Sequence, residues 1–116
     1  MKLKDVGEII AKRNLTVVND KNLKRSIHVL MGKPRRLPDS QGDSFCPWQI
    51  IGISDEQVHY AAGIDSVQAL QLAMRMIGAH LEFINKQIGG NLRWAGDKDG
   101  DLGFPLLVGG KWTDEP

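Results

Sequence analysis

The chain of 116 residues is long enough for one domain with a modest core and too short for two. Hydrophobic residues make up 41% and charged residues 25%, and no apolar run approaches the roughly 18 residues of a membrane span, so a transmembrane helix is excluded. Asp5 and Glu8 interrupt the stretch where a signal peptide needs an unbroken apolar region, and the single Cys46 excludes an internal disulfide. We therefore expect one cytoplasmic domain over residues 1–116, without membrane contact.

The net charge of +1 hides an uneven distribution. Residues 1–36 carry ten basic against three acidic residues, a net charge of +7, whereas the rest carries five basic against eleven acidic residues, a net charge of −6. A basic end of this kind can contact nucleic acid or an acidic protein surface. It can equally be a solvated hairpin whose charges keep an edge strand from aggregating, which is the interpretation we prefer.

Two alternating segments come first along the chain. EIIAKRNLTVV, residues 8–18, and NLKRSIHVLM, residues 22–31, place apolar side chains at odd positions, which predicts two half-buried strands. The intervening NDKN is typical of a turn. Odd positions must then face odd positions, so the loop should hold an odd number of residues or a bulge. A short helix over residues 3–10 is the alternative for the start of the chain.

The next segment predicts a loop and a second hairpin. GKPRRLPDSQGDSFCP has three prolines, two glycines and no periodicity, which indicates a mobile loop over residues 34–46. PWQIIGIS and QVHYAAG flank a turn at residues 54–57 and read as paired strands. If Ile51 faces Tyr60, the opposite face of this hairpin is apolar as well, because it carries Trp48, Ile50 and Ala61.

A long helix is the clearest element of the sequence. Its apolar residues recur at alternate steps of three and four: Val67, Leu70, Met74, Ile77, Leu81, Ile84 and Ile88. Beside this stripe lies a second, narrower apolar ridge of Leu72, Met76 and Phe83. An exposed ridge would indicate a partner surface, although one of three later aromatic residues could cover it: Trp94, Phe104 or Trp112.

These elements together predict an α+β fold. It consists of a four-stranded antiparallel sheet made of two hairpins, packed by one long α-helix that needs a sheet face to bury its stripe. The C-terminal segment is expected to be irregular, with a flexible tail over residues 109–116.

The stretch GIDSVQALQL, residues 63–72, is similar to the site at which acyl carrier proteins attach phosphopantetheine to a serine. Asp65, followed three residues later by Gln68, also fits a helix N-cap with a capping-box partner, which alone accounts for Asp-Ser here. Acyl carrier proteins are helical throughout, whereas two hairpins precede this serine. We therefore interpret Ser66 as a helix-start residue and keep the carrier function as an alternative.

No other pattern predicts a catalytic, cofactor or metal site. DKDGD places Asp97, Asp99 and Asp101 in calcium-loop positions, but Val108 stands where the bidentate glutamate belongs, so we expect an acidic turn. Cys46 has no recognisable base partner. Three histidines lie on different elements without metal-ligand spacing: His28, His59 and His80.

A wider resemblance rests on the segment CPWQIIGISDEQVHYAAGIDSVQALQLAMRMIGAHL, followed by LRWAG and DLGFP. This pattern resembles a family of small bacterial proteins of unknown function, which share Cys-Pro-aromatic, Gly-x-Asp-Ala/Ser-Val-Gln-Ala-Leu-Gln-Leu-Ala and a terminal Leu-Gly-Phe-Pro. The likeness covers residues 46–105. It implies an α+β fold with a meander under one helix, and it supplies no catalytic residues.

The expected function is that of a small non-enzymatic protein-binding module, most specifically an immunity-type protein that neutralises a partner toxin. The face carrying Trp48 is expected to lie opposite the helix, so residues 102–108, a second copy of the chain or a foreign protein should cover it. The expected contact residues are Trp48, Ile50, Leu72, Met76, Phe83, Arg35 and Arg36.

Two other functions stay open as alternatives. One is an enzyme or phosphopantetheine carrier that uses Ser66. The other is nucleic-acid binding through the basic N-terminal hairpin, which few nearby aromatic residues support. Lys12, Lys24, Arg35 and Arg36 are expected to be exposed, without tight nucleic-acid binding at physiological salt.

Overall fold

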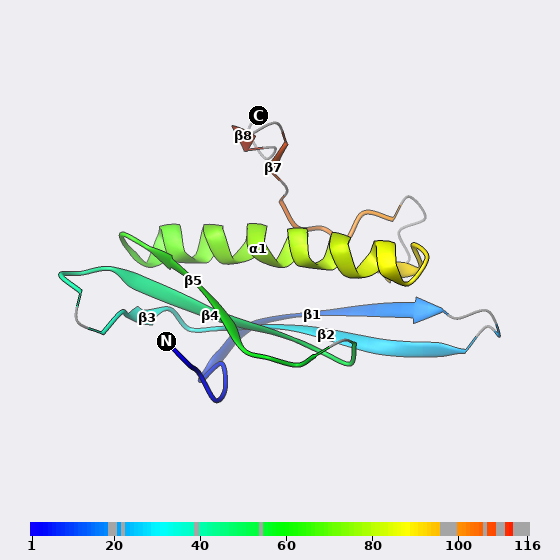
Figure 1. Cartoon of the computed structure of the whole chain (residues 1–116), viewed down its shortest axis with the longest axis horizontal. Helices are drawn as coiled ribbons and strands as arrows, with labels where there is room; N and C mark the ends of the chain where they lie inside the picture. The colour runs from blue at the N-terminus through cyan, green and yellow to red at the C-terminus, as the bar shows by residue number, and fades with distance from the viewer. Residues whose placement is uncertain are drawn as a thin grey trace.

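The computed structural model describes residues 1–18, 21, 23–38, 40–53, 55–95 and 100–105, together with the backbone of residues 107–108 and 111–112. It has two layers, with one long helix lying across an antiparallel sheet (Figure 1). The helix is α1 (Ser66–Gln87), and no helix in the described residues is long and apolar enough to cross a membrane. The strands are β1 (Ile9–Val18), β2 (Lys24–Gly32), β3 (Arg35–Arg36), β4 (Ser44–Ile51), β5 (His59–Gly63), β6 (Leu92–Trp94), β7 (Leu107–Val108) and β8 (Lys111–Trp112).

The sheet contains both predicted hairpins and two further strands. Its order is β5-β4-β2-β1-β6, and all pairings are antiparallel. β3 pairs with the start of β4 on the same edge as β2, so it continues β2 after a register shift of one residue. The α+β architecture is therefore confirmed, but four strands were too few. β7 and β8 form a separate two-stranded ribbon.

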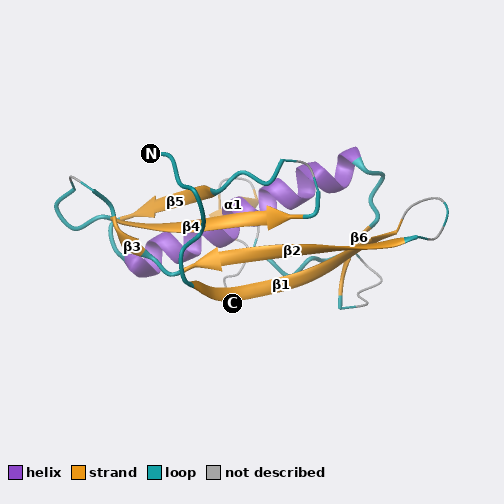
Figure 2. Ribbon diagram, turned by 90° about the horizontal axis from the view of Figure 1, so that it is seen from below, coloured by secondary structure: helices purple, strands orange, loops and turns teal. Residues whose placement is uncertain are grey.

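The first hairpin pairs odd positions with odd positions, as predicted. Leu15 lies opposite Ile27 and Arg13 opposite Val29, so odd positions face odd positions, and a five-residue connection separates the two strands. The alternative helix over residues 3–10 is wrong. Instead, residues 1–8 cross the face of the sheet that α1 leaves open (Figure 2). Val6 is buried there, and the carbonyl of Glu8 accepts a hydrogen bond from the Lys33 backbone at 2.8 Å.

The predicted loop over residues 34–46 is shorter in the structure. Its beginning forms β3 and its end belongs to β4, which leaves residues 37–43 as the connection. The Leu37 N–H donates to the carbonyl of Asp43 at 2.8 Å and closes this connection. The expected irregular C-terminal segment likewise contributes β6, because Leu92–Trp94 pair with Leu15–Val17 of β1.

The register of the second hairpin differs from the prediction by four residues. Tyr60 lies opposite Pro47 rather than Ile51, and His59 lies opposite Trp48. The connection is longer than a four-residue turn because Gly52 leaves the strand with φ +105°, and the Glu56 carboxylate accepts its N–H at 3.0 Å. A shift by an even number of residues keeps each side chain on its face, so Trp48, Ile50 and Ala61 still lie together.

The face that carries Trp48 is the one that α1 covers, which corrects the expectation that it lies opposite the helix. Trp48 is 2% exposed and Ile50 4% exposed within the core beneath the helix, so neither can contact a partner. Two of the buried residues of α1, Ala69 and Ala73, are small, which leaves room beneath the helix for a side chain as large as Trp48. The buried positions of α1 are Ala69, Ala73, Ile77, Gly78, Leu81 and Ile84, whereas Val67 and Met74 of the predicted stripe are exposed.

Candidate functional site

The two flanks of α1 carry the apolar side chains that the sheet does not bury. One flank faces β5, because His80 contacts His59 of that strand and lies one helical turn from Met76 and Phe83. We call Leu72, Met76 and Phe83 the β5 flank. The other flank faces β1, where Met74 lines a pocket with residues of that strand. Val67 and Met74 form the β1 flank.

The β5 flank is open to solvent. Met76 is 42% and Phe83 53% exposed, while Leu72 is half-buried and packs against the core. Beside Phe83 lies a shallow hollow of about 410 Å³, whose other lining residues are Ala79, Glu82, Lys86 and Gln87. The predicted ridge is thus on the surface. Trp94 and Phe104, two of the aromatic residues that were expected to cover it, pack on the other side of α1, and the side chain of Trp112 lies outside the described residues.

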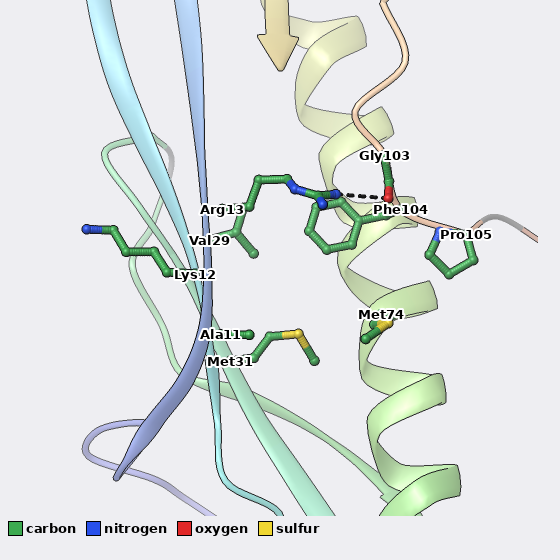
Figure 3. A pocket seen from close by; sticks show the side chains of 9 residues that line it. All are labelled: Ala11, Lys12, Arg13, Val29, Met31, Met74, Gly103, Phe104 and Pro105. Atoms are coloured by element: carbon green, nitrogen blue, oxygen red, sulfur yellow. Dashed lines mark hydrogen bonds between the residues drawn. The ribbon is translucent and has the colours of Figure 1, made fainter. Parts of the chain in front are cut away.

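The β1 flank borders a pocket between the two layers (Figure 3). The pocket has a volume of about 150 Å³ and is mainly apolar. Its walls come from the start of β1, from β2, from α1 and from the segment after β6. The lining residues are Ala11, Lys12, Arg13, Val29, Met31, Met74, Gly103, Phe104 and Pro105. A pocket of this size can hold one apolar side chain.

Arg13 closes one end of this pocket and holds the C-terminal segment. Its guanidinium lies 4.0 Å from the ring centre of Trp94 and 4.8 Å from that of Phe104. It also donates to the carbonyls of Leu102 and Gly103, at 3.2 and 2.9 Å. Burial lowers the pKa of Arg13, and the Asp101 carboxylate opposes that shift. Since an arginine stays charged in proteins, these contacts are a charge-assisted clamp.

Two histidines from different elements, His59 and His80, both contact the Trp48 ring. The ring of His59 stacks on the indole at 4.5 Å between centroids, and His80 meets it edge-on at 5.6 Å. Burial lowers the pKa of His80, His59 lowers it further, and the Asp55 carboxylate raises it. The described residues contain no group of three histidine, cysteine or acidic side chains that could hold a metal. The third histidine lies elsewhere, because His28 Nδ1 is 2.7 Å from the side-chain oxygen of Asn14.

Cys46 and Ser66, the two candidate nucleophiles, have different surroundings. Cys46 is buried under the helix, and burial raises the pKa of its thiol to about 11, which keeps it protonated at neutral pH. Ser66 is exposed at the first position of α1. The preceding Asp65 accepts the Gln68 N–H at 2.8 Å, and the Gln68 side chain accepts the Ile64 N–H at 2.8 Å. The predicted N-cap is confirmed.

The other predicted site residues divide between surface and undescribed positions. Arg35 and Arg36 are exposed on β3, as are Lys12 and Lys24 on the hairpin. The Arg35 guanidinium lies 4.9 Å from the ring centre of Phe45. Asp97 and Asp99 of the calcium-like pattern lie outside the described residues.

The motifs that carry the family resemblance have packing roles in the structure. A Cβ at Gly63 would lie 2.7 Å from the backbone nitrogen of Ala69, so glycine lets the start of α1 approach β5. Gly103 has φ +81°, and a Cβ there would lie 2.5 Å from the Arg13 guanidinium and from Trp94. Cys46 and Trp48 form the floor under the helix. Each motif therefore supports the junction between the sheet, the helix and the C-terminal segment.

The chain belongs to the family described as Domain of unknown function (DUF6968), which matches residues 11–106. This range contains β2 to β6 and α1, together with almost all of β1, and it ends one residue after the pocket residue Pro105. No curated protein and no solved structure matches the chain. The resemblance to a family of unknown function is thereby confirmed, and the family supplies no activity to carry over.

Proposed function

We propose that this domain works by binding another protein through the β5 flank of α1. The observation that carries the proposal is the exposure of Met76 and Phe83, seven residues apart and so on one side of the helix. Methionine and aromatic side chains are enriched at the centres of protein interfaces. The hollow beside Phe83 gives a partner side chain a place to pack, and Glu82 and Lys86 offer a polar rim.

The partner in this proposal is a toxin, and the domain neutralises it by covering its active site. Such a task requires a stable, shaped surface and no reacting group. The separation of charge along the chain supports it, because a strongly polarised surface increases the rate of association with a charged partner. The domain would act in the cytoplasm, a reducing compartment that suits its buried free thiol Cys46.

The experiment uses the product of a neighbouring gene as the candidate partner. The purified domain should bind it, and co-expression should restore growth to cells that the candidate poisons. Phe83→Glu should weaken binding by at least about tenfold, which corresponds to ~1.4 kcal/mol, and should abolish the protection of growth. Gln71→Glu, also on an exposed position of α1, should leave both unchanged.

Two contrary outcomes would test the identity of the partner and the location of the contact surface separately. Binding without protection of growth would contradict the toxin as partner and retain the binding function. A neighbouring product that binds equally well to both glutamate variants would contradict the β5 flank as the contact surface.

A further inference from the structure

One edge of β1 is only partly paired. β6 covers Leu15–Val17, and in the part of the chain that the structure describes no strand lies beside residues 9–14 on that edge. An open edge exposes backbone N–H and C=O groups that can pair with another strand. Six residues is about the length of an average strand.

The pocket lies at this same edge, between the sheet and α1. Along β1, Ala11 and Arg13 point to the helix side, whereas Lys12 and Asn14 point to the open face of the sheet. Figure 3 shows residues 103–105 beside α1 and apart from the ribbon of β1. A strand added beside residues 9–14 would thus point every second side chain to the helix side, where one of them can enter the pocket formed by Met31, Met74 and Phe104.

We infer that this edge and pocket bind an extended segment of another protein, in which apolar side chains alternate with acidic ones. One of the apolar side chains enters the pocket between β1 and α1, and the backbone extends the sheet where β6 stops. The acidic side chains lie on the open face beside the exposed Lys12, in the basic part of the chain. Main-chain hydrogen bonds then provide affinity, and the pocket and Lys12 provide selectivity.

A second copy of this chain fits the edge poorly. In an antiparallel self-pairing over residues 9–14, each Lys12 would lie within about two positions of the partner copy's Lys12, and like charges at that spacing destabilise a strand pair. Lysine at an open edge also discourages pairing with other basic strands. The same side chain therefore rejects a copy of the chain and favours an acidic segment.

This inference rests on the proposed function only in making the domain a protein-binding module. It uses the β1 flank of α1, whereas the proposed toxin contact uses the β5 flank. Either surface can therefore fail while the other is retained.

The probe for a test is a short synthetic peptide in which valine or leucine alternates with glutamate. Titration followed by NMR of the whole chain should perturb the amide signals of residues 9–14, 103 and 104. Met74→Glu should weaken binding by about tenfold or more, and Met76→Glu should change it less than about twofold. The two methionines form a matched pair, since they are 37% and 42% exposed on opposite flanks of one helix.

Two further comparisons test the backbone and the charge. A peptide with N-methyl groups on alternate amides should lose binding, because it cannot pair along the strand. Lys12→Glu should weaken the binding of the acidic peptide. It should strengthen the binding of a peptide that has lysine in place of glutamate. The inference is overturned if the acidic peptide does not bind at millimolar concentration, if N-methylation has no effect, or if both methionine variants bind equally.

Discussion

Met74 and Met76 lie two positions apart on α1 and belong to different surfaces. Met74 lies beside a segment that Arg13 holds in place, and it lines a pocket between two layers. Met76 lies on a flank with no described segment beyond it, near a cluster of two histidines and a buried tryptophan. One flank of the helix thus borders a pocket between the two layers, and the other is an open apolar surface with a shallow hollow beside Phe83. The comparison shows that exposure alone does not define a binding mode, because neighbouring elements shape each surface.

Replacing Trp48 should have the largest effect on stability. Trp48→Ala should lower the free energy of unfolding by about 3–5 kcal/mol, because it leaves a cavity between α1 and the sheet. Phe83→Ala on the β5 flank should lower it by less than about 1 kcal/mol, since the side chain is half exposed. Urea denaturation of both variants measures this difference. Equal losses would mean that the β5 flank is part of the core and not a free surface.

Removing the clamp should release the segment beside the β1 flank. Arg13→Ala should lower the free energy of unfolding by about 1–3 kcal/mol, because two ring contacts and two hydrogen bonds from a charged donor disappear. Arg13→Lys keeps the charge and should recover only part of the loss, since lysine lacks the planar fork. Hydrogen exchange at the amides of residues 102–104 should accelerate in the alanine variant. Unchanged exchange there would contradict the clamp.

The N-cap residue Asp65 stabilises the helix that carries both flanks. Asp65→Ala should lower stability by about 0.5–2 kcal/mol because the Gln68 N–H loses its acceptor. Ser66→Ala should change it by less than about 0.5 kcal/mol, as expected for an exposed side chain. Incubation with a phosphopantetheinyl transferase and coenzyme A should add no mass to the chain. A gain of one phosphopantetheine on intact-mass analysis would instead support the carrier function.

Lowering the pH should loosen the β5 side of the helix. The folded state lowers the pKa of His80, so the unfolded chain binds more protons as the pH falls below about 6.5. The contribution of neutral His80 is therefore complete above that pH and declines below it. His80→Gln should reduce the drop in melting temperature between pH 7.5 and 5.5, whereas His28→Gln on the open sheet face should not. Identical drops in both variants would exclude His80 as the cause.

Local patterns predicted the elements well and their assembly less well. In the first hairpin the apolar residues alternate along both strands, so period two sufficed to predict that odd positions face odd positions. The second hairpin is apolar on both faces, with Phe45 and Pro47 buried on one and Trp48 and Ala61 on the other. Periodicity then shows which residues share a face and not which face the helix covers. The position of α1 depends on Ala69 and Ala73, which a search for large apolar residues overlooks.

The site residues divide in the same way. Met76 and Phe83 could be identified from helical spacing, because they lie beside the main apolar stripe of the helix and not within it. Trp48 and Ile50 could not be excluded as partner-contact residues, since their burial depends on which face of the sheet the helix covers. The pocket had no local signal at all. It combines Ala11, Met74 and Phe104 from three distant segments, which only the folded chain brings together.

Photo-crosslinking in cells tests most directly whether the β5 flank binds a protein. A benzophenone amino acid is placed at Phe83 or, as the control, at Gln71, which is also exposed on α1. We predict that position 83 gives one discrete crosslinked adduct and that position 71 does not give it. A second substitution, Met76→Glu, should remove the adduct from position 83. The same adducts from both positions, or none from position 83, would contradict a partner bound at this flank.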